Sequence, residues 1–153
     1  MFILKLKLTR NHILSMGCLL VAILAMIGHL CTFGSFLPSG KTATQRREFL
    51  SDLGYKTLKS GSCRRVVIPQ RFDMVYTSYN SMQKEADFDL SSYRGLEVEL
   101  YTYKLASLKN YDETEANLLV YRGKIIGGDI ACNRADGFCL PLVECEENLK
   151  EIG

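Results

Sequence analysis

The acidic side chains are the first groups in this sequence whose type and spacing could do chemistry. Glu97 and Glu99 occupy alternate positions of a segment in which apolar and polar residues alternate, so they would share one face of a β-strand. Paired carboxylates can hydrolyse glycosidic bonds, but on an exposed strand such a pair is more commonly a solvated surface. Asp87 and Asp89 flank Phe88 without the spacing of a calcium-binding loop. The carboxylates therefore predict no active site by themselves.

Histidine, the usual general base and zinc ligand, is missing from most of the sequence. The two histidines, His12 and His29, fall at the edge of a long apolar run near the N-terminus and inside it. The remainder cannot assemble a Ser-His-Asp triad, a Cys-His pair or a histidine-ligated zinc site. We expect no catalytic residue, no metal site and no cofactor there, and hence no enzyme.

Four of the six cysteines follow the apolar run, at Cys63, Cys132, Cys139 and Cys145. Their separations lack the close pairs that zinc sites usually have, and four cysteines allow three disulfide connectivities. In an oxidising compartment, Cys139 would pair with Cys132 or Cys145, because these three lie close together in the chain. Four reduced thiols are the alternative.

The apolar run covers residues 13–33 and contains no Asp, Glu, Lys or Arg. A helix of 21 residues, at about 1.5 Å per residue, is roughly 30 Å long and matches the hydrocarbon core of a bilayer. Lys5, Lys7 and Arg10 precede the run, which favours a cytoplasmic N-terminal tail (1–12). We predict a single-pass protein of the cell membrane that contacts lipid through 13–33, with its C-terminal part extracytoplasmic. A cleaved signal peptide is the rival interpretation, but its apolar region is usually shorter.

One face of the predicted span carries mostly small side chains. This face consists of Cys18, Ala22, Ala25, His29 and Thr32. Faces of small residues let membrane helices pack closely, and polar residues in a membrane tend to face protein or water. Self-association of the span is therefore a further hypothesis.

The part of the chain after the span is nearly neutral. Three of the 19 basic residues precede the span, so 16 basic residues face all 17 acids in the remainder. This balance gives no electrostatic footprint for nucleic acid. The roughly 113 residues that follow residue 40 are enough for one domain with its own core.

Local patterns predict a linker (34–41), one extracytoplasmic domain (42–140) and a polar, frayed C-terminal tail (141–153). Thr42 and Gln45 match a capping box at the start of a helix over about 43–53. Helical spacing of Phe72, Val75, Tyr76, Tyr79, Met82 and Ala86 predicts a second, core-facing helix over about 71–86.

Strands are predicted over 65–68, 96–105, 117–121 and 124–130, with a turn at Gly61 and a hairpin at Arg122-Gly123. Gly127-Gly128 inside the last strand indicates a bulge or a close backbone approach. The resulting order α-β-α-β-β-β predicts an α+β fold, an antiparallel sheet with one face covered by the two helices.

A series of short motifs runs through the predicted domain. In order, the motifs are Ile68-Pro-Gln-Arg-Phe-Asp73, Val75-Tyr76, Tyr79-Asn80, Gln83-Lys84, Phe88-Asp-Leu-Ser91, Tyr93-Arg-Gly95, Tyr101-Thr-Tyr103, Ala116-Asn-Leu-Leu-Val-Tyr121, Ile126-Gly-Gly-Asp129 and Asp136-Gly-Phe138. In these motifs the chain resembles an uncharacterised family of membrane-tethered bacterial domains, the domain of unknown function 4830. The resemblance implies an extracytoplasmic domain behind an N-terminal anchor in a Gram-positive bacterium, and it implies no activity. The segment after Phe138 departs from the family pattern.

Five residues within these motifs need not fill a core and are candidates for a polar binding surface. The candidates are Arg94, Tyr101, Tyr103, Asp129 and Asp136. We therefore predict a membrane-anchored protein that presents a small domain outside the cell to bind or sense a protein, a peptide or an envelope component. An accessory subunit of a larger membrane complex and a carboxylate-dependent envelope hydrolase are the alternatives.

Overall fold

The structure is a computed structural model that describes residues 37–106, 108, 111–135 and 137–152. The predicted cytoplasmic tail (1–12) and the predicted span (13–33) lie outside these residues, so the span remains a prediction. Within the described part of the chain, every helix is too short or too polar to traverse a bilayer.

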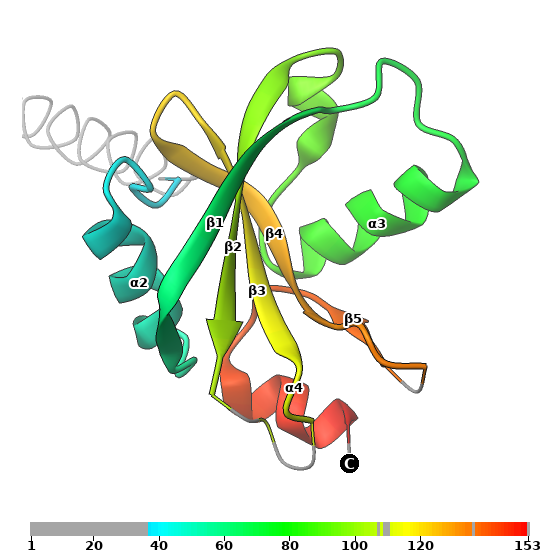
Figure 1. Ribbon diagram of the computed structural model, residues 1–153. Helices are drawn as coiled ribbons and strands as arrows, with labels where there is room; N and C mark the ends of the chain where they lie inside the picture. The colour runs from blue at the N-terminus through cyan, green and yellow to red at the C-terminus, as the bar shows by residue number, and fades with distance from the viewer. Residues whose placement is uncertain (1–36, 107, 109–110, 136, 153) are drawn as a thin grey trace, which may run out of the picture. The chain divides into compact units, whose positions relative to one another are not determined.

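Five antiparallel strands form one sheet, in which they lie side by side in chain order (Figure 1). The strands are β1 (Thr57–Val67), β2 (Glu97–Leu105), β3 (Thr114–Tyr121), β4 (Lys124–Cys132) and β5 (Cys139–Leu140). The helices are α2 (Ala43–Asp52), α3 (Met74–Glu85), the short 3₁₀-helix η1 (Leu90–Tyr93) and α4 (Cys145–Glu151). The predicted α+β class with an antiparallel sheet is confirmed, and the structure adds β5 and α4 to the predicted order.

The two faces of the sheet are covered by different helices. Leu118 and Leu119 are neighbours on β3, and both are buried, in two separate hydrophobic clusters. Successive strand residues point to opposite faces, so one cluster lies on each face. Leu50 of α2 belongs to the Leu118 cluster, whereas Tyr76 of α3 packs against the Leu119 cluster. The prediction that both helices cover one face is therefore wrong, and we refer to an α2 face and an α3 face (Figure 1).

Helix α2 begins and ends where its sequence predicts. The Thr42 hydroxyl accepts a hydrogen bond of 3.2 Å from the backbone N–H of Gln45. The Gln45 side-chain oxygen accepts one of 3.2 Å from the backbone N–H of Thr42, which completes the capping box. Gly54 has a φ of 87°, the left-handed conformation that commonly ends a helix. The fully buried Leu50 anchors the helix to the sheet.

Strand β1 passes through Gly61, where the sequence predicted a turn, although its register with β2 shifts between Thr57 and Gly61. It spans 11 residues, and its register with β2 runs without interruption from Gly61 opposite Tyr103 to Val67 opposite Glu97. A β-carbon at Gly61 would lie 2.8 Å from Cε1 of Tyr103. This glycine therefore admits an aromatic ring from the neighbouring strand instead of turning the chain.

Helix α3 buries polar side chains as well as apolar ones. Tyr76 and Tyr79 are half-buried, in keeping with the predicted stripe, but Val75 is 77% exposed. Asn80 and Gln83 are buried instead. The buried face of α3 is therefore rotated relative to the predicted stripe, so that it includes Asn80 and Gln83 and excludes Val75.

The Gln83 amide attaches α3 to the sheet. Its Nε2 donates a hydrogen bond of 2.8 Å to the Gly128 carbonyl, and its Oε1 accepts one of 2.7 Å from the Gly128 N–H. A β-carbon at Gly127 would lie 2.6 Å from the same Oε1. The register shifts between Leu119 and Val120 of β3 at this point, so both readings of the Gly127-Gly128 pair, a bulge and a close approach, are confirmed.

The hairpin at Arg122-Gly123 is also confirmed. Arg122 and Gly123 have φ values of 48° and 75°, as in the two-residue turns that suit twisted hairpins.

The folded domain extends beyond the predicted limits of 42–140. At the N-terminal end, the N–H of Gly40 donates a hydrogen bond of 2.9 Å to the Gly123 carbonyl. At the C-terminal end, the predicted frayed tail instead forms α4, whose buried Asn148 donates a hydrogen bond of 2.6 Å to the Tyr55 hydroxyl. Part of the predicted linker and most of the predicted tail therefore belong to the domain.

The Gln83 contact gives a first prediction. Gln83→Met keeps the length of the side chain but leaves the buried N–H and C=O of Gly128 without these partners, so we expect the free energy of unfolding to fall by about 2–4 kcal/mol. Urea unfolding measures the change. Gln70→Met, at an exposed glutamine, is the matched control and should stay within about 0.5 kcal/mol of the parent. Equal losses in the two variants would contradict the assigned role.

Candidate binding surfaces

Of the five residues predicted to form one polar surface, the four that the structure describes lie in separate places. Tyr101 and Tyr103 are on the α2 face, since both pack with the cluster of Leu118. Asp129 is on the α3 face, where the Tyr79 hydroxyl donates to it. Arg94 caps η1, with its guanidinium carbon 4.3 Å from the centroid of the Phe72 ring. Asp136 lies outside the described residues, and the other four are too widely separated to form the predicted surface.

A buried arginine of α2 contacts both tyrosines. Tyr103 is only 3% exposed, and Arg46 is buried above it. The Nε of Arg46 donates a hydrogen bond of 2.8 Å to the Tyr103 hydroxyl, and its Nη1 donates one of 2.6 Å to the Gly40 carbonyl. The guanidinium carbon lies 3.5 Å from the centroid of the Tyr101 ring, a cation–π contact. These tyrosines therefore hold α2 on the sheet and do not present a flat aromatic face to a ligand.

Asp129 belongs to a polar row that crosses three strands of the α3 face. Thr102, Asn117 and Asp129 are register partners on β2, β3 and β4. The Thr102 hydroxyl donates to Asn117 over 2.7 Å, and Asn117 Nδ2 donates to Asp129 over 2.8 Å. The Tyr79 hydroxyl donates to the other Asp129 oxygen over 2.8 Å. The carboxylate therefore joins α3 to the sheet.

Burial shifts the pKa values of the two titratable groups in this row, Asp129 and Tyr79. Burial raises the pKa of Asp129, and the hydrogen bonds from Asn117 and Tyr79 oppose that rise. Burial and the nearby Asp129 carboxylate together raise the pKa of Tyr79, so the phenol remains a donor. Asp129 thus carries its charge at an energetic cost.

All four cysteines of the domain are free. Cys139 is the register partner of Ala131, so Cys139 and Cys132 project toward opposite faces of the sheet. Cys145 begins α4, and its N–H donates a hydrogen bond of 2.7 Å to the Leu53 carbonyl at the end of α2. Neither pairing predicted for Cys139 is formed. Burial and the Asp129 carboxylate raise the pKa of the Cys139 thiol to about 11, which makes it a weak nucleophile at neutral pH.

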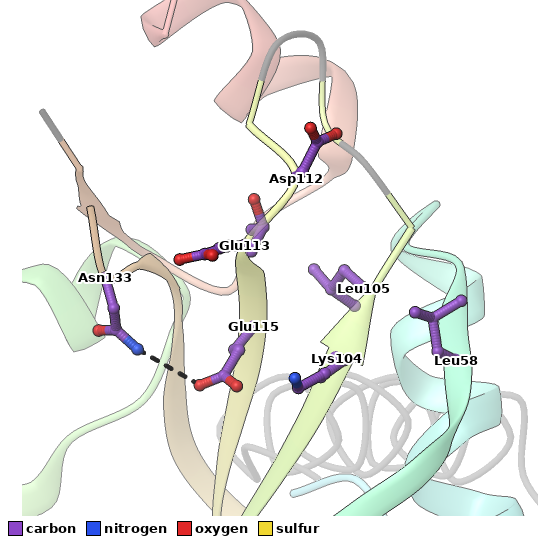
Figure 2. Close-up of a pocket in the computed structure, with 8 residues that line it drawn as sticks. Leu58, Lys104, Leu105, Asp112, Glu113, Glu115 and Asn133 are labelled. Carbon is purple, nitrogen blue, oxygen red and sulfur yellow. Dashed lines mark hydrogen bonds between the residues drawn. The ribbon is translucent and has the colours of Figure 1, made fainter.

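A hollow of about 270 Å³ lies where β2 ends and β3 begins (Figure 2). Its lining includes Asp112, Glu113 and Glu115. Asp112 and Glu113 are exposed, and Glu115 accepts a hydrogen bond of 3.4 Å from Asn133. A general acid in a hydrolase is usually desolvated to raise its pKa, so exposed acids of this kind are more typical of a solvated surface. Among the residues that the structure describes, no group of three or more cysteine, aspartate or glutamate side chains could hold a metal ion.

Strand β1 forms one margin of the sheet and is its most exposed strand. It pairs with β2 on one side, and in the described part of the chain no strand pairs with its other side. Leu58 is 49% exposed and Val67 is 61% exposed, at opposite ends of the strand. Arg64 and Arg65 are exposed between them, and Arg65 forms an ion pair of 3.3 Å with Glu97. Sequence reasoning missed this margin because the predicted turn at Gly61 divided the strand.

The fold therefore defines a small α+β domain whose antiparallel sheet is covered on both faces and open along β1. Residues 49–130, from the second half of α2 to β4, match the family described as Domain of unknown function (DUF4830), and the chain belongs to this family. The resemblance seen in the sequence is thereby confirmed, and the match carries no activity. Comparisons with curated proteins and with solved structures find no match.

The opposite ionisation of two aspartates gives a second prediction. Asp129 has a raised pKa in the folded state, so its contribution to stability is greatest in acid and is lost as pH rises from the unfolded pKa through the folded pKa. Asp129→Asn should therefore gain stability relative to the parent as pH rises. Urea unfolding at a series of pH values between 3 and 7 measures this, within about the range over which carboxylates titrate.

Asp89 is the control, because its pKa is shifted in the opposite direction. Hydrogen bonds from Ser91 and Asn80, with Lys84 nearby, hold the pKa of Asp89 below its usual range. Its contribution is present above the unfolded pKa and is lost as pH falls through the folded pKa. Asp89→Asn should therefore cost more at neutral pH than in acid, and a parallel pH dependence of the two variants would show that the assignment is wrong.

Proposed function

We propose that the chain is a single-pass membrane protein whose α+β domain lies outside the cell and binds a protein or peptide partner. The uncharged run at 13–33 would be the tether, and the basic residues before it would keep the N-terminus in the cytoplasm. The open margin of β1 is the observation that carries the binding role. An exposed sheet edge offers unpaired backbone donors and acceptors to a partner strand.

Two further features of the domain support binding over catalysis. The polar groups on the two covered faces already have partners within the domain: Arg46 holds α2, and Asp129 and Gln83 hold α3. The carboxylates of the hollow in Figure 2 are exposed or bonded to Asn133, so no desolvated acid lies beside a second one there. Exposed main-chain groups along β1 are the part of the domain best suited to a partner.

Site-specific photocrosslinking in intact cells tests this function and gives a third prediction. A photoreactive residue in place of Ser62, on exposed β1, should crosslink a partner, whereas one in place of Glu85, at the exposed end of α3, should not. The protein should remain in the membrane after an alkaline wash, and a protease added outside the cell should remove its domain. A crosslinked partner that is itself an integral membrane protein would identify the chain as an accessory subunit.

Two results would overturn the proposed function. One is a mature form that is released from the membrane without its first 40 residues. The other is a domain that resists external protease in intact cells but is digested after lysis, since that places it in the cytosol.

A further inference from the structure

We propose that β1 binds an extended, acidic segment of its partner as an added antiparallel or parallel strand of the sheet. This rests on the proposed function and names the chemistry of the partner. The inference depends on three observations: the length and openness of the strand edge, its charge, and its exposed apolar ends.

The edge of β1 is long enough to hold a peptide. The strand has 11 residues, about twice the usual length of 5–6. Residues 61–67 follow an unbroken register with β2, so their outer N–H and C=O groups are regularly spaced. The strand contains no proline, the residue that commonly blocks an edge. Seven continuous residues suffice for main-chain pairing of the kind used in peptide recognition by strand addition.

The charge of β1 differs from that of the rest of the domain. The strand contains Lys59, Arg64 and Arg65 and no acid, although acids slightly outnumber bases in the whole part that follows the predicted span. Arg64 belongs to the α3 face, because it is the register partner of Leu100, and Lys104 lies exposed on that same face of β2. Acidic residues at alternate positions of an added strand would lie beside Arg64.

The same charges disfavour a second copy of this chain as the occupant. Two β1 strands paired antiparallel over residues 61–67 would bring the exposed Arg64 side chains of the two copies close together, and like charges on facing strands are destabilising. The acidic residues near the C-terminus are held in α4, so they cannot supply an extended segment. An acidic segment of another protein is the occupant that fits the edge.

The apolar ends of the edge refine the expected ligand. Val67 closes the seven-residue register and is 61% exposed, so an apolar side chain at one end of the peptide would find a neighbour there. A strand with acidic residues at alternate positions and β-branched residues between them would satisfy the backbone, the charge and the exposed valine together.

Peptide binding to the full-length chain in detergent micelles tests this inference and gives a fourth prediction. The probe is a capped seven-residue peptide of alternating valine and glutamate, and a lysine peptide of the same pattern is its control. We expect saturable binding of the glutamate peptide only, measured by fluorescence anisotropy. We also expect slower amide hydrogen exchange confined to the outward-facing amides of residues 61–67. N-methylation of the peptide amides that face β1 should abolish binding, because it removes the N–H groups that would donate to the β1 backbone.

Two charge-reversal variants distinguish peptide binding at the β1 edge from a general electrostatic attraction between the peptide and the domain. Arg64→Glu should weaken binding of the glutamate peptide by about tenfold or more, since it replaces attraction by repulsion at the edge. Arg122→Glu, at the exposed tip of the β3–β4 hairpin, changes the net charge equally and should leave the affinity within about twofold.

Several outcomes would overturn the inference. These are no binding of the glutamate peptide, equal weakening by the two reversals, and protection that maps away from β1. Protection of the outward-facing amides of β1 without peptide would also overturn it, because the amides that do not face β2 would then have another occupant: a second copy if the protection grows with protein concentration, or the chain's own N-terminal part if it does not. A partner that crosslinks at Ser62 although the glutamate peptide does not bind would leave the proposed function standing and remove only this inference, whereas a cytosolic domain that binds the peptide would do the reverse.

Discussion

The close approach of Gln83 to the backbone at Gly127-Gly128 is the constraint on which the α3 side of the domain depends. A side chain at Gly127 would meet Oε1 of Gln83 and, at 3.1 Å, Cδ2 of Leu90. A side chain at Gly128 would collide with the carbonyl oxygen of Asn117, on the neighbouring strand. The two glycines therefore let a helix contact the strand directly, and the Gln83 amide forms hydrogen bonds with both the N–H and the carbonyl group of Gly128.

This approach also accounts for the buried carboxylate. Tyr79 precedes Gln83 by four residues, so both side chains lie on one face of α3. With Gln83 fixed on Gly128, the Tyr79 hydroxyl lies over Asp129, the next residue of β4, and donates to it. Asp129 is buried as a consequence and is satisfied by Tyr79 and Asn117. Polar residues that resemble a ligand site in the sequence are thus used to attach a helix.

Local chemistry was sufficient to predict the hairpin at Arg122-Gly123, the capping box of α2 and the close approach at Gly127. It was insufficient wherever a distant element decides the outcome. Tyr103 shares a strand face with Glu97 and Glu99 and was expected on an open surface, but α2 covers that face and Arg46 binds its hydroxyl. Gly61 was expected to turn the chain because nothing nearby in the sequence shows that the Tyr103 ring lies against it. Tyr101 and Tyr103 are also separated from Asp129, which lies on the opposite face of the sheet.

Coverage of both faces has a consequence for recognition. Because α2 and α3 cover much of both faces, the margins of the described sheet are the places where its backbone is open to a partner, and β5, with two residues, is too short to template a strand. The other margin, β1, is long and open, which in a soluble protein invites uncontrolled pairing with further copies. Arg64 opposes that self-pairing by repulsion while leaving the backbone free. A charge that repels an identical strand attracts an acidic one, so the protection of this edge and its selectivity have the same physical origin.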